Sequence, residues 1–357
     1  MRIALIRRDT ALDRPDGINV AALSLASGLI GLGHDVHYVS SHSVGLATDV
    51  HDHYEIEHWP EIHTLTSGVA LRRREATLLW RFVGVRLLQA IQPDVVVSNG
   101  ILPFNLGFPE CNITHDLETT GRGPTIVRST LRRWKLRRVQ TVAATCSEIA
   151  EELTAYTNQR VSVIENPIVI GNRPGASQEG RRDVVHVGTT TYKNPRTTVL
   201  SFAQSAPPDA HLHLVGPPTP ETDGLLAQLD AGVRDRVTVH GFVDRDVLLD
   251  LLGSARIVCV PSKYDVRVAS PTVLEAAAAG ATVIASSVSR DLLLDGASGL
   301  ELNDAESISE CSTLMSRVYG DESLAQRLGA DAREQVRRYD ADAVARRAVD
   351  VLQSARP

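Results

Sequence analysis

The chain has 357 residues, of which 43% are hydrophobic, with 37 lysines and arginines against 43 aspartates and glutamates. This length exceeds one typical hydrophobic core and predicts two domains of comparable size. The net charge of −6 argues against a nucleic-acid partner, because a phosphate backbone attracts basic surfaces.

The cysteine spacing and the apolar runs argue against further classes of protein: metal-binding, disulfide-stabilised, secreted and membrane-spanning. The four cysteines are widely scattered, so they show neither a metal-binding knuckle nor a disulfide framework. The N-terminal run MRIALIRRD is broken by arginines before a signal-peptide core forms, and no run approaches the ~20 apolar residues of a membrane span. We therefore expect a soluble cytoplasmic protein.

In the first half of the chain, short β-branched runs alternate with helix-period stretches, which is typical of a parallel sheet. A helix is expected over residues 18–33, where apolar positions recur at three and four and Gly33 ends the pattern. The expected strands are RIALIR (2–7), DVHYVSS (35–41), DVVVSNG (94–100), NITHD (112–116), TVAATCS (141–147) and VSVIEN (161–166).

The same alternation restarts after GNRPGASQEGRRD, residues 171–183, a polar and Gly-rich stretch that we interpret as a linker. The expected strands of the second half are VVHVG (184–188), HLHLVG (211–216), RVTVHGF (236–242), RIVCVPS (256–262) and TVIASS (282–287), followed by helices. The chain is thus divided into an N-terminal domain (1–170), a C-terminal domain (184–340) and a last helix (341–357) that packs back on the N-terminal domain. Two Rossmann-like domains facing across a cleft would bind ligands at their strand carboxyl ends.

One stretch of the second half, SKYDVRVASPTVLEAAAAGATVIAS, residues 262–286, combines features of a ligand site. Ser270 and Pro271 form a helix start, in which the serine hydroxyl accepts a backbone N–H. Such an N-terminus attracts phosphate. Glu275, about one turn later, is suited to two vicinal hydroxyls, as in a ribose; a carboxylate that only complements the helix dipole is the alternative interpretation.

Several motifs occur in one order along the chain. ASPTVLEAAAAGATVIASSVS is followed by LLLDGASGLELN, and earlier segments include GINVAALSLASGLIGLGHDVHYVSS, ITHD, ATCSEIAEEL, VIENPI, VHVGTTTYKNP and VHGFVDRDVLLDLLGSARIVCVPS. This series resembles family 4 of the retaining glycosyltransferases, which have the GT-B fold. Each match alone is weak, but their collinear order over nearly the whole chain is specific.

The resemblance implies transfer of a sugar from a nucleotide-diphosphate donor, bound mainly by the second domain, to a small-molecule or lipid-linked acceptor. Lys193 in TYKNP matches the family lysine that neutralises the diphosphate, and His115 in THD matches the histidine near the transferred sugar. Each residue also has a structural interpretation, as a solvated loop lysine and a strand-end histidine. The expected donor-binding residues are Gly17, Gly188, Thr189, Lys193, Gly216, Ser270, Thr272 and Glu275. No cofactor and no metal are expected, because we see no ligand set for one.

The chain departs from the family pattern at two donor positions. The family has a second glutamate eight positions before the one matched by Glu275, and Arg267 stands there. Aligning PSKYD instead assigns the sugar-contacting, catalytic role to Asp265, with Arg267 as a further phosphate contact. Thr189 replaces the arginine that commonly follows the glycine, so other groups must supply the positive charge.

The sequence is less informative about the acceptor. Arg7, Arg8 and Asn105 lie in first-domain loops that we expect to contact it. The basic stretch from Arg128 to Arg138 around Trp134, and a second cluster around Arg72–Arg74, Trp80 and Arg81, allow peripheral contact with the inner membrane face, although such runs are more often solvated helix faces. Two other functions remain open: a non-hydrolysing sugar-nucleotide epimerase, and a catalytically degenerate nucleotide-sugar binding scaffold.

Overall fold

The chain forms two compact units in the computed structural model. The first unit comprises Met1–Val169 and Tyr339–Pro357, and the second comprises Ile170–Arg338. The structure describes residues 1–11, 17–43, 54, 56–67, 73–99, 104–115, 130, 133–170, 178–264, 267–293 and 295–356. No helix in these ranges is both long enough and apolar enough to cross a membrane.

The first unit is built on a parallel sheet. In the described residues it has seven strands in the order β3-β2-β1-β4-β5-β6-β7. The strands are β1 (Arg2–Ala11), β2 (Asp35–Ser43), β3 (Glu61–Ser67), β4 (Val95–Asn99), β5 (Glu110–Thr114), β6 (Thr141–Ala144) and β7 (Val161–Val163). The helices are α1 (Gly17–Gly31), α2 (Arg73–Leu79), the π-helix η2 (Trp80–Gly84), α3 (Val85–Ile91), α5 (Ser147–Thr154) and, from the end of the chain, α13 (Ala341–Ser354).

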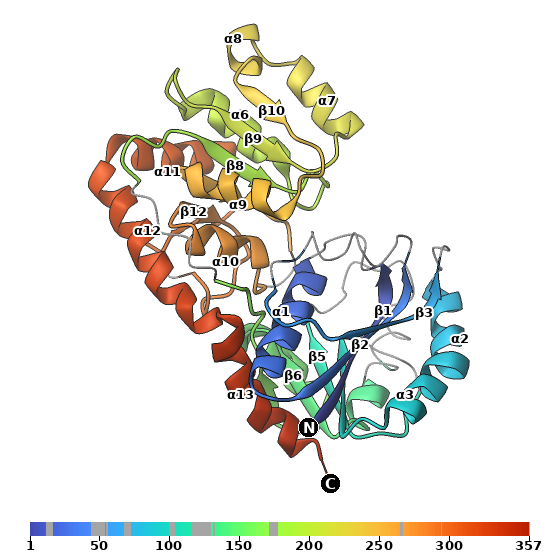
Figure 1. The fold of residues 1–357 in the computed structure, drawn as a ribbon. Coiled ribbons are helices and arrows are strands. Elements are labelled where there is room, and N and C mark those ends of the chain that lie inside the picture. Colours follow the sequence, from blue (N-terminus) through green and yellow to red (C-terminus); the bar gives the residue numbers. More distant parts are fainter. Residues whose placement is uncertain are drawn as a thin grey trace. The chain divides into compact units, whose positions relative to one another are not determined.

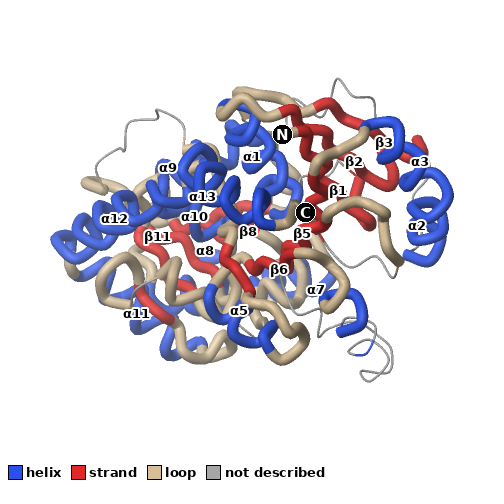
Figure 2. Tube along the Cα trace, turned by 90° about the horizontal axis from the view of Figure 1, so that it is seen from below, coloured by secondary structure: helices blue, strands red, loops and turns tan. Residues whose placement is uncertain are grey.

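Both faces of this sheet are covered. Ile3 and Leu5 of β1 pack in one core with α1 and α13, and α13 runs beside α1 (Figure 1). The alternate residues, Ala4 and Ile6, pack in a second core with η2 and α3, which lie toward the β3 edge (Figure 2). A strand buried on both faces reads as a continuous apolar run, which is the signal that the sequence carries at residues 2–7.

The second unit contains a second parallel sheet, in the order β10-β9-β8-β11-β12-β13. Its strands are β8 (Val184–Val187), β9 (Leu212–Val215), β10 (Val237–Val239), β11 (Ile257–Val260), β12 (Thr282–Ala285) and β13 (Leu300–Glu301). Its helices are α6 (Pro195–Ser205), α7 (Pro220–Ala227), α8 (Ala231–Arg234), α9 (Arg245–Ser254), α10 (Pro271–Ala278), α11 (Ile308–Gly320) and α12 (Glu322–Val336), with the 3-10 turn η3 (Arg337–Tyr339) after α12.

The structure adds two strands to those expected from the sequence, β3 and β13. β3 has the sequence EIHTLTS and is an edge strand with largely half-exposed side chains, so it lacks the apolar run that marks the other strands.

The described part of the expected linker also has buried contacts: Gln178 donates to the carbonyl of Gly280 and Arg181 to that of Ala255, both inside the second unit.

Close packing between α1 and α13 depends on Gly28. A Cβ atom at Gly28 would lie 2.4 Å from the carbonyl oxygen of Ala341 and 2.9 Å from the Cβ of Ala345. The backbones of the two helices therefore approach more closely than any side chain at position 28 permits.

We predict that Gly28→Ala destabilises the protein by about 1–3 kcal/mol, since the new methyl group meets backbone atoms rather than a flexible side chain. Thermal unfolding followed by circular dichroism measures the effect. The matched control is Gly253→Ala in α9, where an added Cβ meets no atom within 4 Å; its stability should be unchanged or raised by up to about 1 kcal/mol. Equal stability of the two variants would contradict this view of the α1–α13 contact.

Candidate active site

Most donor-site candidates of the second unit follow two neighbouring strands, β8 and β11, and Gly216 follows the adjacent strand β9. From β8 the chain crosses through α6 to β9 on one side, and from β11 it crosses through α10 to β12 on the other. Since parallel crossovers are right-handed, the two helices lie on opposite faces of the sheet. In open parallel sheets, ligands bind at the carboxyl ends of the strands at such a reversal of strand order.

The loops that follow these two strands are in direct contact. The amide of Lys263, after β11, donates to the carbonyl of Tyr192, after β8, at 2.7 Å. The rings of Tyr192 and Tyr264 lie 5.8 Å apart. The Nζ atom of Lys193 is 5.7 Å from the first ring centroid and 5.9 Å from the second, within the range of cation–π attraction. Both loops therefore position the ammonium group of Lys193.

Two glycines leave space at this edge. Gly188 has φ +99°, and a Cβ there would lie 2.8 Å from Cγ of Lys193. Gly216 has φ +139°, and its Cβ would lie 3.0 Å from Oγ1 of Thr189. Both conformations favour glycine, and a side chain at position 188 would also displace the lysine.

His186 supports the Gly188 turn and was not identified from the sequence. Its Nε2 lies 2.8 Å from the carbonyl oxygen of Gly188, and its Nδ1 lies 2.8 Å from the hydroxyl of Thr198. Burial is the largest cause that lowers the pKa of His186, to about 4, so the imidazole is neutral at pH 7. A neutral ring that donates from Nε2 and accepts at Nδ1 satisfies both contacts. In the sequence, His186 is one polar residue inside an apolar run, without a motif to mark it.

The N-terminus of α10 agrees with the sequence prediction in part. Ser270 is its N-cap residue, is buried, and is followed by proline at the first helical position. The expected side-chain cap is absent, because the hydroxyl of Ser270 accepts no hydrogen bond from the helix. Pro271 has no N–H, and the amide of Val273 donates to the carbonyl of Ser270. The amide of Thr272, between them, has no acceptor within the helix.

Glu275 is buried in α10 and pairs with an arginine from α9. Its Oε1 accepts a hydrogen bond from Nη1 of Arg245 at 2.6 Å, with the glutamate side chain 6% exposed and the arginine side chain 10% exposed. A solvated face is therefore not the setting of Glu275. Asp244 is the N-cap of α9, and Arg245, which follows it and which no motif marked in the sequence, reaches the candidate site.

The basic residues near these loops differ in whether a carboxylate neutralises them. Lys263 pairs with Glu306, and Arg267 pairs with Glu301 and donates to the carbonyl of Val288. The proposed phosphate contact of Arg267 therefore competes with an existing ion pair, and Asp265 lies outside the described residues. Thr189 is also engaged, since its hydroxyl donates to the carbonyl of Pro217 at 2.6 Å.

Lys193, in contrast, has no hydrogen-bond or ion-pair partner for its ammonium among the residues that the structure describes. Burial lowers the pKa of Lys193, and the nearby carboxylate of Glu275 partly opposes this change. Lys193 is half-buried, and its ammonium, which no described carboxylate neutralises, is available to an anionic ligand.

In the first unit, His115 follows β5 and lies beside the end of β4. Its Nε2 is 3.2 Å from Oδ1 of Asn99, and its Nδ1 is buried without a hydrogen-bond partner among the described residues. Burial, followed by the positive charge of Arg7, lowers the pKa of His115 to about 3, while Asn166 has a smaller, opposing effect. The structure thus brings together a neutral His115, Arg7 and Asn99, of which Asn99 was not predicted.

The remaining first-unit candidates are less closely associated. Gly17 is the exposed first residue of α1, and the side chain of Arg8 lies outside the described part of the structure. Asn105 accepts a hydrogen bond from the amide of Gly107, and within the described ranges no hydrogen bond joins it to Arg7 or His115.

The basic clusters differ from a simple solvated face or membrane anchor. In the described part of the Arg128–Arg138 stretch, Lys135 is buried and pairs with Glu110, while Arg138 stacks on the ring of Trp134 at 4.3 Å. In the second cluster, Trp80 is fully buried and its indole donates to Ser41, so this tryptophan is not a membrane anchor.

Two family models match successive halves of the chain: "Glycosyltransferase Family 4" over residues 15–171 and "Glycosyl transferases group 1" over residues 181–319. The chain belongs to glycosyltransferase family 4. This confirms the family predicted from the collinear motifs, and the two parallel-sheet units confirm the GT-B fold class.

Solved structures share this family 4 fold over nearly the full length. Sucrose-phosphate synthase from Thermosynechococcus elongatus matches with a TM-score of 0.77 and 20% identity, covering 99% of this chain and 98% of that chain. HepE from Anabaena, solved in complex with UDP, matches with a TM-score of 0.77 and 17% identity, covering 99% of this chain and 100% of that chain. HepE has also been solved in complex with UDP-glucose.

A curated relative, D-inositol 3-phosphate glycosyltransferase from Xylanimonas cellulosilytica, is 34% identical over 137 residues. This match covers 38% of the chain and 32% of the relative, so the aligned region spans about a third of that protein.

The buried histidines lead to a prediction for pH dependence. The pKa values of His115, about 3, and His186, about 4, lie below the ~6.5 of an unfolded histidine. As the pH falls, the unfolded chain takes up these protons first, so the stability contribution is complete above about pH 6.5 and is lost progressively below it.

We expect stability to fall below about pH 6.5 and the ring resonances of both histidines to remain those of the neutral form down to pH 5. An NMR titration, with His115→Gln and His186→Gln used for assignment, measures this. A midpoint near 6.5 for either ring would refute the assigned protonation states.

Proposed function

We propose that this protein is a retaining glycosyltransferase that transfers a sugar from a nucleotide-diphosphate donor, bound by the second unit, to a small-molecule or lipid-linked acceptor. The observation that carries the proposal is the ammonium of Lys193, which the loops after β8 and β11 hold without a carboxylate partner in the described residues. The membership of the chain in glycosyltransferase family 4 supports glycosyl transfer. UDP and UDP-glucose in the solved HepE complexes support a nucleotide-sugar donor.

The chemistry requires stabilisation of the diphosphate as a leaving group. Negative charge builds up on the diphosphate while the bond between its terminal oxygen and the anomeric carbon breaks. The oxygen of the acceptor hydroxyl bonds to the same face of that carbon, and the hydroxyl proton passes to the departing diphosphate. The ammonium of Lys193 is charged, and the amide of Thr272 at the start of α10 has no backbone acceptor among the described residues. Both groups would favour this charge without reorganising. We propose that these groups act without a metal ion.

Glu275 is proposed to accept hydrogen bonds from the ribose. The pair with Arg245 occupies one carboxylate oxygen, Oε1, and a carboxylate offers about four acceptor sites in total. The arginine thus fixes the orientation of Glu275 and compensates its buried charge, while lone pairs remain for two hydroxyl groups.

The acceptor side of the proposal rests on the first unit. His115, neutral and beside Arg7, is proposed to contact the transferred sugar. Membrane contact is proposed only as peripheral, through the Arg128–Arg138 stretch, in which Trp134 is 37% exposed. In the second basic cluster, Leu78 and Phe82 rather than Trp80 are the exposed apolar residues. A cytoplasmic location stays a prediction.

We expect Lys193→Ala to reduce turnover about 10²- to 10³-fold, as the loss of one transition-state contact typically does. Release of nucleoside diphosphate from UDP-, GDP- and dTDP-sugars, with water and candidate acceptors, measures it. The matched control is Lys263→Ala, which removes a neighbouring lysine that pairs with Glu306 and should change turnover less than threefold. Equal losses in both variants would contradict the role of Lys193. Binding of donor by the unaltered protein without turnover would instead identify a binding scaffold.

We further expect Glu275→Gln to remove discrimination between ribose and deoxyribose. The unaltered protein should bind UDP more tightly than its 2′-deoxy form, and the variant should bind both with similar, weaker affinity in calorimetric titration. Arg245→Gln is the companion variant: it breaks the same ion pair but leaves the carboxylate, so a reduced discrimination should persist. Discrimination that survives Glu275→Gln would exclude a ribose contact.

A further inference from the structure

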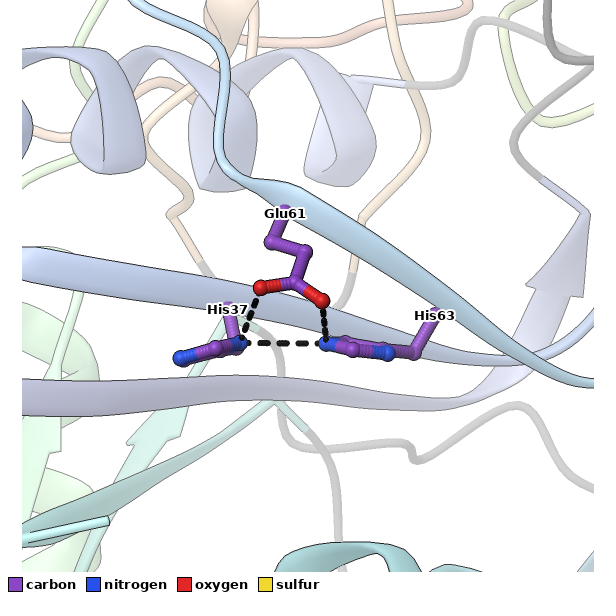
Figure 3. Close-up of side chains that lie close together, drawn as sticks. All are labelled: His37, Glu61 and His63. Carbon is purple, nitrogen blue, oxygen red and sulfur yellow. Dashed lines mark hydrogen bonds and ion pairs between the residues drawn. The ribbon is translucent and has the colours of Figure 1, made fainter. Parts of the chain in front are cut away.

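Three potential metal ligands meet at the edge of the first sheet, outside the candidate active site. In the parallel register of β2 and β3, His37 lies opposite Glu61, and Val39 lies opposite His63. Because side chains alternate along a strand, the two-residue steps from His37 to Val39 and from Glu61 to His63 place all three polar side chains on one face. Figure 3 shows the carboxylate of Glu61 pointing toward both imidazole rings.

The distances fit a common bound cation. Nδ1 of His37 lies 3.0 Å from Nε2 of His63, and the carboxylate oxygens of Glu61 lie 3.3 Å and 3.5 Å from these two nitrogens. In a tetrahedral site with metal–ligand distances of about 2.0–2.1 Å, neighbouring ligand atoms are separated by about 3.3 Å. Glu61 approaches His37 through Oε2 and His63 through Oε1, and one ligand atom from each of the three residues lies within 4.8 Å of the other two.

A second histidine pair, His213 and His240, also has a carboxylate nearby, but in a different arrangement. Nδ1 of His213 lies 2.9 Å from Nε2 of His240, but the nearby carboxylate of Asp183 faces the other nitrogen, Nε2 of His213, at 3.5 Å. That pair is a chain of hydrogen bonds. At His37 and His63 the carboxylate of Glu61 instead faces, with one oxygen each, the two nitrogens that also face each other.

The groups around the rings are consistent with ligation. A metal on Nδ1 of His37 leaves its Nε2 protonated; this atom makes no hydrogen bond in the part of the chain that the structure describes, and Oδ1 of Asp35 lies 3.4 Å away, within ion-pair range. Carboxylates in that position orient metal-binding histidines.

We propose that His37, His63 and Glu61 form a binding site for a divalent transition metal of the zinc class, with the remaining coordination position open to water. Two imidazole nitrogens and one carboxylate oxygen favour such ions over calcium or magnesium, which prefer all-oxygen sites. The ion would tie the edge strand β3 to β2, because it has ligands on both strands.

This site is separate from the proposed transfer reaction. His37 and Glu61 lie near the amino ends of their strands, whereas Asn99 and His115 lie at the carboxyl ends of β4 and β5. The proposed role of the metal is to stabilise the first unit, and the proposal stands independently of glycosyl transfer.

The test uses the full chain after treatment with a chelator. Calorimetric titration with Zn²⁺ measures affinity and stoichiometry, and titration with Co²⁺ adds a visible spectrum that reports coordination geometry and the absence of thiolate ligands. The variants are His63→Gln and Glu61→Gln. Glu61 is 66% exposed and His63 is 19% exposed in their side chains, so both variants should fold, as circular dichroism will verify. The matched control is His240→Gln, which disrupts the other histidine pair.

We expect one Zn²⁺ per chain, a rise in unfolding temperature on binding, and loss of at least about tenfold in affinity in His63→Gln and Glu61→Gln but not in His240→Gln. Absence of binding at millimolar metal would overturn the proposal and identify the histidines as a hydrogen-bonded pair only. Undiminished binding in His63→Gln, or an equal loss in His240→Gln, would also overturn it.

Discussion

The backbone turn at Gly188 is the constraint on which the candidate donor site depends. Directly after β8, this residue adopts a positive φ, and its missing side chain gives the stem of Lys193 room to lie against the backbone. His186 holds the carbonyl of the same glycine, and the loop after β11 adds Tyr264 and a backbone hydrogen bond to Tyr192. The position of the ammonium group therefore follows from the local backbone of β8 and from its neighbour in the sheet, rather than from an ion pair.

Charge compensation divides the basic residues of this region by role. Arg245, Lys263 and Arg267 each face a carboxylate, and such pairs stabilise a fixed arrangement of the loops and helices. Lys193 has no such partner in the described residues, and burial without a partner is unfavourable unless a ligand supplies the opposite charge. Thr189 stands where the family commonly has an arginine. Arg267 does not supply the missing positive charge, because it pairs with Glu301. Lys193 and the start of α10 consequently carry most of the proposed stabilisation of the diphosphate.

The two ends of the first sheet have different chemistry. At the carboxyl ends of β4 and β5, Asn99 and His115 form a polar group with Arg7 of β1, the residue paired with Asn99, and burial keeps the histidine neutral. At the amino ends of β2 and β3, two histidines and a glutamate converge on the edge of the sheet. The edge strand β3 pairs with only one neighbour, β2, so a further contact between these two strands would stabilise it. A cation shared between β2 and β3 would provide that contact.

The sequence alone determined the elements whose signals are local. Apolar runs gave β1, β4, β8 and β11, the Ser-Pro pair gave the start of α10, and the motif order identified the family. It did not reveal β3, whose polar residues carry no core signal. It also did not reveal that Lys135, within a basic run, is buried and pairs with Glu110. The pairs Arg245–Glu275 and His37–His63 join residues on different elements, and their side chains meet only because the sheet register and helix packing place them together. Such contacts have no fixed spacing in the sequence, so only the tertiary structure decided them.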